Sequence, residues 1–240
     1  MTPPAPRAGH DAAPERDPQL LEVDGARPWL SLVIPHLPFY TPKQRLALVA
    51  IAADTHGGKE TTEPGHDRLA AFTSLSLTDL SSAIGGLLLP RDRSPYSTPA
   101  LRRVRRGTTG ARTAYRLLLP DLEARHTLTV DDERPAAGLL CLLPRLDLTL
   151  SARLVLTMLT LLSVDGRTVE ASNRHLAVLC GIGRDTVIAA MDQLCHDVPP
   201  GTDHHLPNGR PALLEVLADS AGQRPARYRL DLLPYVTGGA

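Results

Sequence analysis

The sequence predicts an α+β fold, mostly α-helical, built from two similar domains that follow one another along the chain. The first observation is an internal repeat with a period of about 107 residues. The second is that each copy contains three helix-like patterns and then two short strand-like runs around a polar turn. Because both copies carry the whole series, we expect two complete domains.

The repeat is clearest where the first copy reads RLALVAIAADTHGGKETTEPGHDRLAAFTSLSLTDLSSAIGGL (45–87) and the second reads RLVLTMLTLLSVDGRTVEASNRHLAVLCGIGRDTVIAAMDQL (153–194). One inserted residue near Glu60 aligns the two copies. The likeness reaches upstream, from LVIPHLPFYTP to LCLLPRLDLTL, and downstream, from YRLLLP to YRLDLLP. The apolar positions that then coincide are Leu46, Leu69, Leu80, Ile84 and Leu87 with Leu154, Leu176, Val187, Met191 and Leu194.

Each copy is expected to open with an amphipathic helix. Apolar or small residues recur at i, i+3, i+4 and i+7 from Leu46, and a similar spacing starts at Leu154. We expect the glycines at 57–58 and at 166 to end these helices.

Two shorter helices should follow in each copy, separated by a tight turn. The second helix is expected from Glu63–Pro64 to Phe72 and from Ser172 to Leu179, since Pro suits a first turn and Ser an N-cap. The turns fall at 73–76 and 180–183. The third helix is indicated by its apolar spacing: Leu80, Ile84 and Leu87, then Val187, Met191 and Leu194.

A hairpin closes each copy. Runs at 101–104 and 113–119 flank Gly107 and Gly110, and runs at 212–217 and 227–232 flank a polar stretch. The resulting domain boundaries are a disordered tail (1–27), a first domain (28–120), a linker (121–138), a second domain (139–236) and a short tail (237–240). The linker contains an acidic run and Pro135, so we expect separable domains.

This order of elements resembles the winged helix-turn-helix superfamily, in particular bacterial, actinomycete-like regulators and plasmid-type replication initiators. The core of the resemblance is RLAAFTSLSLTDLSSAIGGL from Arg68 and HLAVLCGIGRDTVIAAMDQL from His175. The resemblance implies a sequence-specific double-stranded DNA-binding protein, with a third helix in the major groove and a hairpin wing on phosphate. The leading hypothesis is a transcriptional regulator whose two domains bind neighbouring half-sites about one helical turn apart.

The resemblance also implies which residues meet DNA. The outward positions of the recognition helices are Leu77, Thr78, Asp79, Ser81 and Ser82 in the first copy, and Arg184, Asp185, Thr186, Ile188 and Ala189 in the second. Arg184 is the best candidate base reader, although Asp79 and Asp185 argue against strong groove binding. The first wing carries Arg102, Arg103, Arg105, Arg106, Arg112 and Arg116, and the second Arg210, Arg224, Arg227 and Arg229.

The charge balance leaves nucleic-acid affinity to such local patches. Lys and Arg total 26, as do Asp and Glu, so the formal net charge is zero. No apolar run approaches the roughly 20 residues needed to cross a bilayer, and the N-terminus lacks a signal-peptide layout. We expect a cytoplasmic, nucleoid-associated protein with reduced cysteines, no membrane partner and no cofactor. A homodimer would extend the DNA footprint.

Other classes of function have weaker support. Cys195, His196, Asp197, His204 and His205 have metal-ligand side chains, but their spacing matches no zinc pattern, so no metal site is expected. No nucleophile elbow, phosphate loop or paired-carboxylate motif indicates an enzyme. The alternatives are a plasmid or mobile-element replication initiator and, in another class, a winged-helix protein-interaction scaffold.

Overall fold

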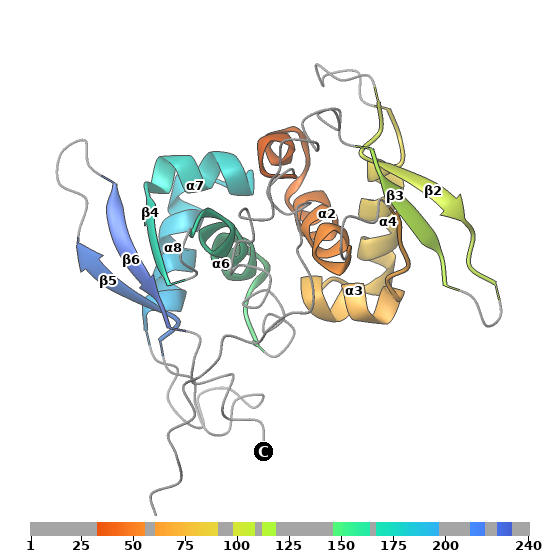
Figure 1. Ribbon diagram of the computed structural model, residues 1–240. Helices are drawn as coiled ribbons and strands as arrows, with labels where there is room; N and C mark the ends of the chain where they lie inside the picture. Colours follow the sequence, from red (N-terminus) through yellow and green to blue (C-terminus); the bar gives the residue numbers. More distant parts are fainter. Residues whose placement is uncertain are drawn as a thin grey trace, which may run out of the picture.

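The computed structural model describes residues 33–55, 61–90, 98–108, 112–118, 146–163, 167–196, 212–218 and 225–231. These residues form two units with the same order of elements from their first α-helices onward, and the two sheets lie at opposite ends of the molecule with α2 and α6 between them (Figure 1). The predicted tails and linker lie outside the described residues. The mixed fold of helices and small antiparallel sheets agrees with the predicted α+β class.

The first unit runs from a 3-10 helix to a hairpin. Its elements are η1 (Ile34–Phe39), α2 (Pro42–Asp54), β1 (Thr61–Thr62), α3 (His66–Thr73), α4 (Leu77–Leu87), β2 (Leu101–Arg105) and β3 (Ala114–Leu117). The second unit contains α6 (Leu150–Leu162), β4 (Thr168–Ala171), α7 (Asn173–Cys180), α8 (Arg184–Cys195), β5 (Leu214–Ala218) and β6 (Ala226–Leu230).

The two sheets share one topology. Their strand orders are β1-β3-β2 and β4-β6-β5, all antiparallel, so the last strand of each unit is central. Both hairpins also carry a register shift at the same place, between Arg103 and Arg105 and between Val216 and Ala218. From the first α-helix onward, the elements of the two units therefore match in order and in sheet topology.

Strands β1 and β4 are absent from the sequence prediction. They lie between the first and second helices, where Thr62 pairs with Tyr115 and Val169 pairs with Tyr228. Strands this short give little periodicity, although β-branched residues are present in both. The first helices also end earlier than predicted, at Asp54 and Leu162, before the glycines are reached.

The prediction that the first helix of each copy is amphipathic is wrong. Every residue from Arg45 to Ala53 of α2 and from Ala152 to Leu161 of α6 is buried. A helix buried on all sides needs a partner beyond its own unit. The buried apolar residues of both units form one continuous cluster, which includes Leu37, Ile51 and Leu156.

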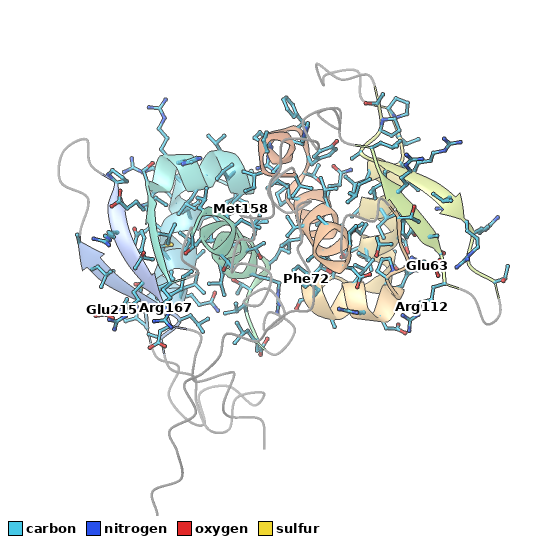
Figure 2. The ribbon with its side chains drawn as sticks, viewed as in Figure 1. Glu63, Phe72, Arg112, Met158, Arg167 and Glu215 are labelled. Atoms are coloured by element: carbon cyan, nitrogen blue, oxygen red, sulfur yellow. The ribbon has the colours of Figure 1, made fainter. Side chains whose placement is uncertain are left out.

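Two buried arginines connect the units. Arg45 of α2 donates through Nη1 to the carbonyls of Val178 (2.6 Å) and Leu179 at the end of α7. Arg153 of α6 donates through Nη1 to the carbonyl of Phe72 at the end of α3 (3.2 Å). Figure 2 shows Phe72 where the two units meet. This packing does not support the expectation that the units are separable.

The turns before α4 and α8 use the left-handed backbone region. Ser74 ends α3 at φ 53° and Gly181 ends α7 at φ 67°. Gly181 suits this conformation because it has no Cβ, whereas Ser74 adopts it at a steric cost. The turns then lead into α4, whose first turn is capped by Ser76 accepting from the Asp79 amide, and into α8.

Candidate nucleic-acid interface

The outer side of helix α4 is mostly polar, and its one acidic residue, Asp79, forms an ion pair with a lysine of α2. Leu80, Ile84 and Leu87 are buried, as their spacing predicted. Leu77, Thr78, Ser81 and Ser82 are exposed, and Asp79 is partly exposed. The predicted outward positions therefore share one side of α4.

Asp79 forms an ion pair that the sequence analysis missed. Lys43 of α2 lies 2.7 Å from Asp79 Oδ1, and this hydrogen bond lowers the pKa of Asp79. The pair reduces the repulsion that a lone carboxylate would exert on phosphate, although exposed pairs of this kind add little stability. Helix spacing alone could not reveal it, because Lys43 belongs to another helix.

Helix α8 carries Arg184, the best candidate base reader of the sequence analysis. Arg184, Asp185, Thr186, Ile188 and Ala189 are all exposed, while Val187, Met191 and Leu194 are buried. Arg184 is the first residue of α8, directly after the N-cap Gly183, so its exposed side chain lies at the N-terminal end of the helix.

The first hairpin concentrates exposed arginines. Arg102, Arg103 and Arg105 lie on β2, Arg106 follows it, and Arg112 precedes β3; all five are exposed. The hairpin end is closed by Gly107, whose amide donates to Thr113 Oγ1 (3.0 Å). The sequence prediction that arginines gather on one hairpin agrees with these positions.

Arg105 and Arg112 are held against the rest of the unit. Arg105 Nη2 lies 2.5 Å from Glu63 Oε2, and it donates to the carbonyl of Arg112 (3.3 Å). Arg105 pairs in register with Ala114 of β3. Figure 2 shows Glu63 and Arg112 together at the first sheet. The side chain of Arg112 also lies beside Gly65, the N-cap of α3.

A further contact orders the base of this hairpin. Tyr115 Oη lies 3.2 Å from His66 Nε2. Burial raises the pKa of Tyr115, and the neighbouring Arg103 opposes that rise. Arg103 pairs in register with Tyr115, so its stem leaves the sheet beside an aromatic ring while its charge remains exposed.

The second hairpin differs in chemistry from the first. Strand β5 reads LEVLA where β2 reads LRRVR, and Val216 and Leu217 are 44% and 41% exposed. Glu215 forms an ion pair with Arg229 across the sheet, whereas Arg227 is exposed. Arg210 and Arg224 lie outside the described residues. Of the arginines predicted for this hairpin, Arg229 shares its charge with Glu215 and Arg227 is exposed. The described part of the second hairpin is therefore less positive than the first.

No group of three or more His, Cys, Asp or Glu side chains that could hold a metal is found within the described ranges. Asp197, His204 and His205 lie outside those ranges. Within the same ranges, no helix has both the length and the apolar character needed to span a membrane. Scans against protein-family models, curated protein sequences and solved structures return no match.

Proposed function

We propose that the chain is a sequence-specific double-stranded DNA-binding protein, acting as a transcriptional regulator, in which each unit is a winged helix-turn-helix domain. The observation that carries the proposal is the first unit's arrangement of a solvent-facing helix, α4, followed by a hairpin with five exposed arginines in a chain of zero net charge. A helix fits the major groove and arginine suits phosphate.

The element order supports this proposal. In both units a helix, a short strand, two helices joined by a tight turn and a hairpin follow one another, and the sheet order is the same. The three helices followed by a hairpin are the arrangement that the winged-helix resemblance implies, and the short strands β1 and β4 are additions to it. The recognition helices would be α4 and α8, with Arg184 reading a base and the first hairpin serving as a wing on phosphate.

A salt titration of DNA binding tests the phosphate contacts. Replacing Arg103 and Arg106 with Gln removes two exposed charges, so the slope of log K against log salt should become less steep by about 1.8. The matched control is Glu63→Gln, which leaves every arginine in place and frees Arg105 from its carboxylate. It should not flatten the slope. An unchanged slope in the arginine variant would contradict the wing assignment.

Base reading by Arg184 is tested separately. Arg184→Ala should cost about 1 to 3 kcal/mol on a selected site and little on random duplex. Equal losses on both would make Arg184 a phosphate contact.

One observation favours a second candidate function, protein interaction through the second hairpin. Val216 and Leu217 are exposed apolar residues on β5, which lies at a sheet edge. Edge strands with apolar side chains can pair with another chain. Binding of this kind would be insensitive to salt and to Arg184→Ala, and would be weakened by Val216→Lys.

A further inference from the structure

The contacts between the units are reciprocal: equivalent residues of the two copies make the same contact, each with the opposite unit. Arg45 and Arg153 occupy the same place in the two copies, and so do Phe72 and Leu179. Arg45 contacts the Leu179 carbonyl in the second unit, and Arg153 contacts the Phe72 carbonyl in the first. When residue i of one unit contacts j of the other, and the reverse also holds, the units are related by a twofold axis.

A second pair of hydrogen bonds repeats the pattern within each unit. Arg45 Nη2 donates to the Pro38 carbonyl (3.1 Å), and Arg153 Nη2 donates to the Leu146 carbonyl (2.6 Å). Pro38 and Leu146 are equivalent positions of the repeat. Each guanidinium therefore joins its own unit to the opposite one in the same way. Two units stacked by translation would instead use two different surfaces.

The reciprocal contacts also fix the orientation of the units. Arg45 is 4% exposed and Arg153 is 1% exposed, so each guanidinium is buried among the carbonyls it binds. Moving the units apart would break these charge-assisted hydrogen bonds and expose the apolar core that the two units share, and both changes are costly. Carbonyls at a helix C-terminus carry partial negative charge, which favours a cation there.

We propose that the chain binds DNA as a rigid internal dimer that recognises an imperfect inverted repeat with fixed spacing. The inference rests on the proposed DNA-binding function. A twofold axis relates α4 to α8, so their half-sites on one duplex run in opposite directions. The half-sites differ in sequence because Thr78, Asp79 and Ser81 of α4 are matched by Asp185, Thr186 and Ile188 of α8.

The test begins with selection from a randomised duplex library by the full chain at two salt concentrations. Enrichment of two different half-sites in inverted order supports the inference. Enrichment of a direct repeat or of a single half-site overturns the inference and leaves DNA binding intact. No retention at either salt overturns the proposed function itself.

Spacing then tests rigidity with the wild-type chain. Inserting about 5 base pairs, half a turn, or about 10, a full turn, between the half-sites should each lower affinity about 100-fold or more, to that of one half-site. Units on a flexible tether would tolerate the full-turn insertion, and that result would overturn the fixed arrangement.

A distance measurement without DNA tests the rigid arrangement of the two units separately from DNA binding. Spin labels at Ser82→Cys of α4 and Ala189→Cys of α8, with the native cysteines replaced, occupy equivalent exposed positions. A single narrow distance distribution supports the rigid dimer even if no duplex binds, and a broad distribution overturns it even if one does. Gly85→Cys in place of Ser82→Cys provides a second label position on α4.

Discussion

Gly181→Ala should destabilise the protein by about 2.5 to 5 kcal/mol, through a strained backbone and the loss of one hydrogen bond. The left-handed backbone at φ 67° costs an L-residue about 1 to 2 kcal/mol. An added Cβ would also lie 2.6 Å from both Cζ and Nη2 of Arg45, so the guanidinium must shift. Each charge-assisted hydrogen bond that it loses, to Val178 or Leu179, accounts for about 1.5 to 3 kcal/mol.

Urea denaturation followed by circular dichroism measures the loss, and each kcal/mol corresponds to about 2 to 4 °C in thermal midpoint for a chain of this size. A double-mutant cycle with Arg45→Ala isolates the collision. In that background Gly181→Ala should cost only the backbone contribution, about 1 to 2 kcal/mol. A cost that is the same with and without Arg45 would refute the contact between this guanidinium and the end of α7.

Three other changes have defined outcomes. Gly85→Ala should stabilise by about 0.5 to 1 kcal/mol because its Cβ meets nothing within 4 Å and glycine is a poor helix former; a loss on thermal melting would contradict this. Gly86→Ala should stabilise less than Gly85→Ala, since its Cβ would lie 2.0 Å from Gln44 Nε2 and displace the Gln44 side chain, whose Oε1 accepts from the Thr41 amide at the start of α2; Gln44→Ala should remove that difference. Burial raises the pKa of the Cys180 thiol to about 12, and the neighbouring Arg45 opposes that rise, so the thiol should resist alkylation at pH 8 until the chain unfolds. The free energy of unfolding should fall as the pH rises from about 9 to 12, because the thiol of the unfolded chain ionises at a lower pH than the buried thiol.

The elements that carry the candidate site could be predicted from sequence because their signals are local. The spacing of Leu80, Ile84 and Leu87 defines the buried side of α4 and, by elimination, its exposed side. The strand-like run at 227–232 likewise predicted β6, which the structure places at Ala226–Leu230. In these cases the buried face lies within one unit, so the pattern of one copy contains all the necessary information.

What the sequence did not reveal depends on the other copy or on distant residues. Helix α2 was taken as amphipathic because positions i, i+3, i+4 and i+7 from Leu46 are apolar, although the positions between them are apolar too and face the opposite unit. Arg45 and Arg153 are buried for the same reason. A signal did exist: each arginine directly precedes a run without further charged residues, at the same place in both copies. The ion pair of Lys43 with Asp79 had no comparable signal.

Covalent connection removes a constraint that a dimer of identical chains must obey. In such a dimer any substitution appears twice, so a positively charged wing on one side implies one on the other. Here Arg102 and Arg103 correspond to Glu215 and Val216, on strands with the same register and the same irregularity. One duplicated scaffold therefore supports two unlike surfaces, and each can be altered by mutation without changing its counterpart.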